Sequence, residues 1–110
     1  MSKLQQLETL LLQSPNDPFL HYAIGLELVK KGNLQQAAKG FEQLIQNHPE
    51  YIATYYQLGK LYEELNNAPK ALEIYRKGIK QAFGKETKTY NELQTAYQNL
   101  LLNIEDDLLS

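Results

Sequence analysis

The fold is decided by two stretches of sequence, HYAIGLELVKKGNLQQAAKGFEQLIQNHP at residues 21–49 and YYQLGKLYEELNNAPKALEIYRKGIKQAF at residues 55–83. A shift of 34 residues brings identical or similar residues into register. The matched pairs are Tyr22 with Tyr56, Ile24 with Leu58, Gly25 with Gly59, Asn33 with Asn67, Ala37 with Ala71, Phe41 with Tyr75 and Ile45 with Ile79. A fixed period of this length is typical of an array of repeated structural units.

Each unit predicts two helices, because its apolar residues recur at spacings of three and four. In the first unit we expect helices over residues 18–31 and 34–47. Gly32 and Asn33 separate them, since Gly accepts a left-handed helix end and Asn caps free N–H groups. In the second unit Asn66 and Asn67 stand at this place.

The proline residues and Gly84 mark where helices end and begin. Pro49 prevents further helix after the first unit. In the second unit Pro69 falls within the first helical turn, where its missing N–H costs little. Phe83 and Gly84 stand where a second Pro would fall, so we expect a helix stop based on Gly.

These residues resemble the tetratricopeptide repeat, whose signature is W-x₂-L-G-x₂-Y, then A-x₃-F, then P. The matching residues of the first unit are His21, Ile24, Gly25, Leu28, Ala37, Phe41 and Pro49. Those of the second unit are Tyr55, Leu58, Gly59, Tyr62, Ala71 and Tyr75. Both units keep the small, large and breaker positions of the signature.

The resemblance implies an all-α fold, a right-handed α-solenoid of antiparallel helix pairs with about six helices. We expect one domain over residues 1–110. Its parts are an N-terminal half-repeat helix at 3–15, repeat 1 at 18–51, repeat 2 at 52–85, a C-terminal capping helix at 86–104 and an acidic tail at 105–110.

The two repeat glycines predict close helix crossings. Gly inside a helix costs about 1 kcal/mol relative to Ala, so Gly25 and Gly59 need a packing reason. We expect a facing helix to approach there, with Ala37 and Ala71 as the matching small surface. Phe41 and Tyr75 then fill the volume beyond it.

The composition narrows the class of protein. The chain has 110 residues, no Cys and a formal net charge of −2, which excludes disulfides and thiolate chemistry and gives no general attraction to nucleic acid or membranes. No apolar run approaches the roughly 20 residues of a membrane span, and the first residues do not form a signal peptide. We therefore expect a cytoplasmic protein.

Catalytic residues, a cofactor site and a metal site are not expected. His21 stands at the signature's Trp position, which favours a place at the edge of the core. His48 precedes Pro49 at a helix end, and neither histidine has a ligand four residues away. An enzyme needs a nucleophile, an acid–base pair or a metal cluster within reach, and no such set is present.

Instead, the resemblance implies a protein-binding groove on the first helix of each unit. Each first helix carries a second stripe of residues beside its core face. The candidate groove residues are Phe19, Tyr22, Leu26, Val29, Tyr51, Tyr56, Lys60, Glu63, Tyr90, Gln94 and Tyr97. We expect a non-catalytic scaffold that holds a peptide or helix of a partner protein.

The period of 34 also connects Tyr22, Tyr56 and Tyr90. Phenol rings suit adaptable recognition because each combines a large apolar area with one polar tip. Alternatively, the three rings pack between neighbouring helices, and the sequence leaves both interpretations open.

The resemblance also argues against one ligand class. Repeat proteins of this kind that hold the acidic tails of chaperones grip two carboxylates with a clamp of Lys, Asn and Arg. The corresponding positions of this chain hold Tyr22, Leu26, Gln57, Thr87 and Asn91 and form no cationic clamp, so an acidic chaperone tail is not the expected ligand. An apolar or aromatic segment is favoured.

Two further observations concern a basic segment of the chain and its two terminal helices. Between residues 70 and 88 six cations outnumber two glutamates, which is typical of a solvated helix face rather than a nucleic-acid site. The terminal helices are rich in leucine, which leaves open an alternative function, self-assembly into a homo-oligomer. The residues concerned are Leu4, Leu7, Leu11, Leu100, Leu101, Ile104, Leu108 and Leu109.

Overall fold

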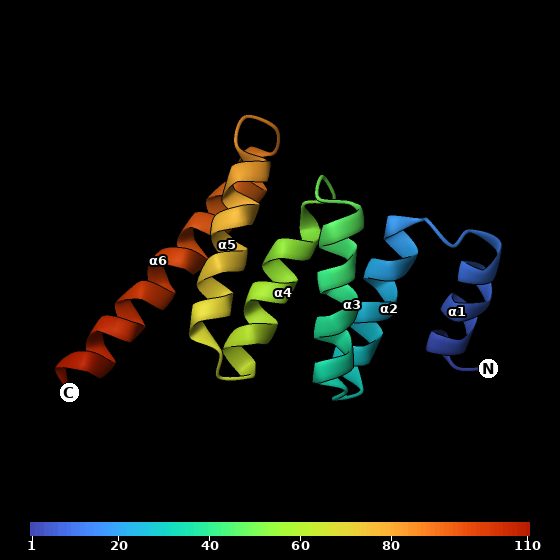
Figure 1. Cartoon of the computed structure of the whole chain (residues 1–110), viewed down its shortest axis with the longest axis horizontal. Helices are drawn as coiled ribbons and strands as arrows, with labels where there is room; N and C mark the ends of the chain where they lie inside the picture. The colour runs from blue at the N-terminus through green and yellow to red at the C-terminus, as the bar shows by residue number, and fades with distance from the viewer. The chain divides into compact units, whose positions relative to one another are not determined.

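The computed structural model describes all 110 residues and contains six α-helices and no strand (Figure 1). The helices are α1 (Lys3–Gln13), α2 (Pro18–Lys30), α3 (Leu34–Asn47), α4 (Ala53–Glu64), α5 (Ala68–Ala82) and α6 (Thr87–Leu109). The all-α class and the number of helices agree with the sequence. None of the six combines the length and the apolar character that a membrane crossing requires.

The chain forms two compact units, Met1–Thr54 and Tyr55–Ser110. In the first unit, α2 packs against both α1 and α3. An ion pair also joins α1 to α2, because Lys3 Nζ lies 3.5 Å from Glu27 Oε1. The buried apolar residues of this unit are Leu7, Leu20, Leu28, Ala37, Ala38, Phe41, Leu44 and Ile52.

The second unit contains most of α4 together with α5 and α6, and α5 packs against α6. Its core is richer in phenol rings than the core of the first unit. The buried apolar and aromatic residues are Tyr55, Leu58, Leu61, Tyr62, Ala71, Ile74, Tyr75, Ala82, Leu93, Ala96 and Leu100.

The close crossings predicted at the two repeat glycines are confirmed. A Cβ atom added to Gly25 would overlap the ring of Phe41, and one added to Gly59 would overlap the ring of Tyr75. Both rings are completely buried. In each repeat, the space that a side chain on the glycine would need is therefore filled by the aromatic ring 16 residues later in the chain.

A third close crossing, at Gly78 of α5, has no counterpart in the first repeat, where Leu44 stands 34 residues earlier. A Cβ on Gly78 would overlap Tyr55 of α4 and crowd Leu93 of α6. Leu93 itself occupies the repeat position that Gly25 and Gly59 hold. At this crossing the glycine therefore stands on α5, and the large side chain, Leu93, stands on α6.

The helix ends largely follow the predicted signals. Gly32 and Gly84 have positive φ angles of 82° and 73°, and Asn66 takes the left-handed conformation at φ 58°. The side chain of Asn67 accepts a hydrogen bond from the backbone N–H of Lys70 at 3.3 Å. Asn33 differs, since its side chain makes no capping hydrogen bond. The backbone N–H groups of Asn33 and Asn67 both donate to the preceding helix, at 2.9 Å to Leu28 O and at 2.8 Å to Tyr62 O.

Two helix ends differ from the expected ones. α1 ends at Gln13 rather than near residue 15, because a residue before Pro, here Ser14 before Pro15, is driven out of the helical region. α6 continues to Leu109 instead of stopping at 104, since no Gly or Pro interrupts the chain after Gly84.

Substitution of the helical glycines tests the crossings. Gly25→Ala forces a methyl group into the Phe41 ring, so we expect a loss of about 1–3 kcal/mol in the free energy of unfolding. Gly40 of α3 has open space around it, and Gly40→Ala is expected to stabilise by up to about 1 kcal/mol through helix propensity. Urea unfolding measures both, and equal effects of the two substitutions would contradict this packing.

Candidate functional site

In the first unit, the predicted groove residue Tyr22 belongs to an aromatic cluster. Its ring lies 6.1 Å from the Phe41 ring and 5.6 Å from the Tyr51 ring, both tilted. Tyr22 and Tyr51 are half-buried. Burial, with smaller contributions from Tyr22 and Asp17, raises the pKa of Tyr51 above its ordinary value. Tyr22 therefore packs within its own unit and keeps part of its ring exposed.

The other predicted groove residues of this unit are apolar and reachable by solvent. Phe19 is 58% exposed, and Leu26 and Val29 of α2 are half-buried. These three predicted groove residues of α2 are themselves apolar and uncharged.

The two histidines of the first unit line one small polar cavity of about 160 Å³. His21 Nε2 forms a 2.7 Å hydrogen bond with Pro15 O, and His48 Nδ1 lies 3.8 Å from Glu50 Oε2. Nowhere in the chain do three His, Asp or Glu side chains gather where they could hold a metal ion. The histidines thus have structural partners at the ends of α2 and α3.

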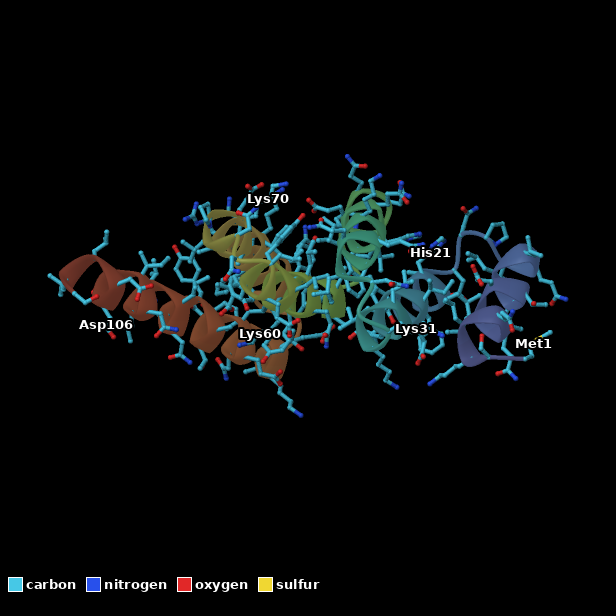
Figure 2. All side chains as sticks on the ribbon, turned by 90° about the horizontal axis from the view of Figure 1, so that it is seen from below. Met1, His21, Lys31, Lys60, Lys70 and Asp106 are labelled. Atoms are coloured by element: carbon cyan, nitrogen blue, oxygen red, sulfur yellow. The ribbon has the colours of Figure 1, made fainter.

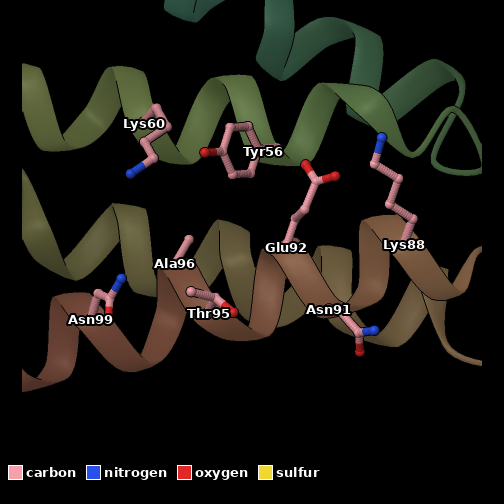
Figure 3. Close-up of a pocket in the computed structure, with 8 residues that line it drawn as sticks. All are labelled: Tyr56, Lys60, Lys88, Asn91, Glu92, Thr95, Ala96 and Asn99. Atoms are coloured by element: carbon pink, nitrogen blue, oxygen red, sulfur yellow. The ribbon is translucent and has the colours of Figure 1, made fainter.

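In the second unit, an open groove lies between α4 and α6 (Figure 3). Its volume is about 400 Å³. α4 contributes Tyr56 and Lys60, and α6 contributes Lys88, Asn91, Glu92, Thr95, Ala96 and Asn99. Only Tyr56 and Lys60 of this set were predicted as groove residues from the sequence.

The α6 side of this groove is polar and available to a ligand. Lys88, Asn91, Glu92, Thr95 and Asn99 are all exposed, and none of their side chains makes a hydrogen bond or an ion pair within the chain. Lys88, Glu92 and Ala96 follow one another at a spacing of four residues, and so do Asn91, Thr95 and Asn99. Such rows run along one side of a helix, and a helical projection of residues 87–109 would have identified them.

The groove residues of α4 are connected to the core by a series of side-chain contacts. The hydroxyl of the buried Tyr75 donates a hydrogen bond to Glu63 Oε2. Lys60 Nζ lies 4.0 Å from the same oxygen and 5.7 Å from the centre of the Tyr56 ring. Tyr75, Glu63, Lys60 and Tyr56 therefore form a continuous chain of contacts from the core to the groove.

In the first repeat, the residues at the positions of these four contacting side chains are apolar or aromatic. Residues 34 positions earlier are Phe41, Val29, Leu26 and Tyr22. The hydroxyl of Tyr75, absent from Phe41, coincides with a hydrogen-bond acceptor at Glu63 in place of Val29. The two repeats thus share one backbone pattern but present different surfaces, apolar in the first and charged in the second.

The predicted groove residues of α6 do not line the groove. Tyr90 lies 5.8 Å from the ring of Phe83, and its hydroxyl accepts a hydrogen bond from Gln94 at 2.9 Å. The hydroxyl of Tyr97 accepts a 3.2 Å hydrogen bond from Arg76 of α5. Tyr56 and Tyr90 hold the same repeat position, yet Tyr56 lines the groove, whereas Tyr90 contacts Phe83 and Gln94.

The basic residues of α5 are separate from the groove. Lys60 and Lys70 emerge on opposite sides of the second unit (Figure 2). Lys70 Nζ lies 5.4 Å from the centre of the Tyr62 ring, and Lys77 Nζ lies 3.2 Å from Glu73 Oε1. These contacts fit the solvated helix face expected from the sequence.

The buried phenol of Tyr75 predicts a pH dependence of stability. Burial, together with the hydrogen bond to Glu63 and its charge, raises the pKa of Tyr75 well above the ordinary value of about 10. The folded state then holds this proton more tightly than the unfolded state, so stability is full below about pH 10 and falls as the pH rises further.

The substitution Tyr75→Phe removes this titration, and Phe is the residue that the first repeat has at this position. We expect the free energy of unfolding in urea to fall less steeply between about pH 9 and about pH 11 in the variant than in the unmodified protein. Identical slopes would show that Tyr75 is not the group responsible.

The sequence is similar to a known family of repeat proteins. The family model described as tetratricopeptide repeat matches residues 28–100. No curated protein matches the chain.

Solved structures are similar over most of the chain. A tetratricopeptide repeat domain protein from Salinibacter ruber, solved by NMR, is 40% identical with a TM-score of 0.75, covering 78% of this chain and 88% of that one. A crystal structure of such a protein from the same organism is 40% identical with a TM-score of 0.73, covering 76% and 96%. A Bordetella parapertussis protein shares the fold at 18% identity, with a TM-score of 0.80 and coverage of 94% and 90%.

Proposed function

The chain belongs to the tetratricopeptide repeat family, and from this premise we propose that it is a non-catalytic module that binds a segment of a partner protein. The groove between α4 and α6 is the proposed binding surface. The repeat resemblance predicted a groove lined by several tyrosines, and the proposal rests on one of them, Tyr56, together with the polar rows of α6.

One observation carries this proposal, namely the set of unengaged polar side chains around a partly exposed aromatic ring. Amide, hydroxyl, ammonium and carboxylate groups all line the groove beside Tyr56 and Ala96. Binding sites commonly combine an apolar contact area with a few polar groups that fix orientation. An aromatic ring beside unengaged hydrogen-bonding groups provides both.

The spacing of the polar groups favours an extended segment. Asn91, Thr95 and Asn99 stand four residues apart on α6, which corresponds to about 6 Å along a helix. An extended chain repeats every two residues, or about 6.6 Å. Successive side chains of this row can therefore reach every second residue of a strand lying along α6.

The charges of the groove favour a partner segment of mixed character. Lys60 and Lys88 line it together with Glu92, and Lys60 Nζ also lies 4.0 Å from the carboxylate of Glu63, so charges of both signs are present. A uniformly acidic tail would meet the carboxylate of Glu92 as well as the two ammonium groups. A segment that combines an apolar or aromatic side chain for Tyr56 with polar groups for α6 fits better.

Peptide selection tests the groove. A phage-displayed library of random linear peptides is selected against the protein, and the affinity of the recovered peptides is measured by fluorescence anisotropy. Tyr56→Ala removes the aromatic contact, and we expect it to weaken binding at least about tenfold. Asn99→Ala removes one amide from the polar row of α6 and is expected to weaken binding less, because the other polar side chains of that row remain.

Lys77→Ala is the matched control, because Lys77 lies on α5 and pairs with Glu73. It is expected to leave the affinity unchanged. Chemical-shift changes in the protein on addition of a peptide should fall on α4 and α6. Selected peptides that bind the Tyr56→Ala variant as tightly as the unmodified protein would refute the groove assignment.

A further inference from the structure

The exposed large apolar side chains of the second unit lie only at the two ends of the hairpin formed by α5 and α6. Phe83, in the turn between the helices, is 70% exposed. Leu102, Leu108 and Leu109, near the end of α6, are 57%, 81% and 87% exposed. We name the segment Leu102–Leu109 the overhang, and the residues Lys80, Phe83 and Lys85 the turn patch.

The overhang extends beyond the helix that α6 packs against (Figure 1). α6 has 23 residues and α5 has 15, so α6 is longer by about 12 Å at a rise of about 1.5 Å per residue. Asp106 lies near the C-terminal end of α6 (Figure 2). The last two turns of α6 therefore carry leucines that no partner helix covers.

The two ends of the hairpin carry opposite charge. Glu105, Asp106 and Asp107 lie in the overhang, where the negative end of the helix dipole makes acidic residues unfavourable. Residues 80–88 contain three lysines and one glutamate.

We propose that the overhang of one copy of the protein docks on the turn patch of a second copy. Leu108 and Leu109 would pack against Phe83, and the acidic residues of the overhang would lie near Lys80 and Lys85. Each end of the hairpin thus supplies what the other end lacks, an apolar contact and a charge of opposite sign. Such a contact joins two different surfaces, so it can continue from copy to copy.

The turn patch of a second copy is favoured over another exposed apolar surface, the outer face of α1. That face exposes Leu12 and carries the carboxylate of Glu8. The one basic side chain of α1, Lys3, is already paired with Glu27. An acidic overhang would therefore meet a like charge on α1, whereas it meets unlike charges at the turn patch. The contact is also independent of the groove between α4 and α6.

Complementary variants test this contact by multi-angle light scattering. The mass of a single chain is 12.7 kDa, and we expect the average mass of the unmodified protein to rise with concentration. The double variant Leu108→Ser with Leu109→Ser and the variant Phe83→Ser each remove one surface, so each alone should stay a monomer. An equimolar mixture of the two should form a dimer and nothing larger, since each retains the surface that the other lacks.

Controls separate the contact from other origins of assembly. Leu12→Ser removes an equally exposed leucine of α1 and should leave the mass increase unchanged, as should Tyr56→Ala in the groove. Combining Lys80→Glu and Lys85→Glu should abolish association, and mixing that variant with Glu105→Lys and Asp107→Lys should restore it. Circular dichroism confirms that each variant is folded.

Several results would overturn the proposal. A monomer at every concentration of the unmodified protein excludes the contact. Persistent association of Phe83→Ser alone shows that overhangs pair with each other, and loss of association in Leu12→Ser shows that α1 is the acceptor.

Discussion

In both units, an aromatic ring on one helix occupies the space that a side chain on the facing glycine would need. The ring of Phe41 lies against Gly25, and the ring of Tyr75 lies against Gly59. The two helices of a repeat can approach closely only because the glycine has no side chain, and the ring fills the volume on the other side. The buried stripes of α2, α3, α4 and α5 are arranged around these two contacts.

The same packing position also connects the core to the surface. Phe41 ends as an apolar ring, and the neighbouring side chain of the first repeat is Val29. Tyr75 adds a hydroxyl that donates to Glu63, and Lys60 lies beside that carboxylate. The two repeats thus differ in the core by the hydroxyl group of Tyr75, and they differ at the surface as well, which is apolar in the first repeat and a charged groove in the second.

The hairpin of α5 and α6 adds a second kind of asymmetry. Its core is conventional, with Leu93 against Gly78, but apolar groups and charge are separated between its two ends. The overhang is acidic, and the turn is basic. The groove lies between α4 and α6, so a partner segment there and a second copy at the ends of the hairpin would use different side chains.

The sequence alone determined the helical class, the repeat period and the two close crossings. These features depend on local signals, since Gly, Pro and Asn mark the helix ends and a spacing of three and four marks the buried face. The left-handed conformations of Gly32 and Gly84 follow from the same signals.

The tertiary structure decided which surface residues lie together. Tyr56 and Tyr90 hold the same repeat position, but Tyr56 lines the groove because α6 lies beside it, while Tyr90 packs on Phe83. A repeat pattern fixes where a residue stands on its own helix, and it does not specify which helix stands opposite. For the same reason the contact between Gly78, Tyr55 and Leu93 became evident only in three dimensions, because three separate helices supply its members.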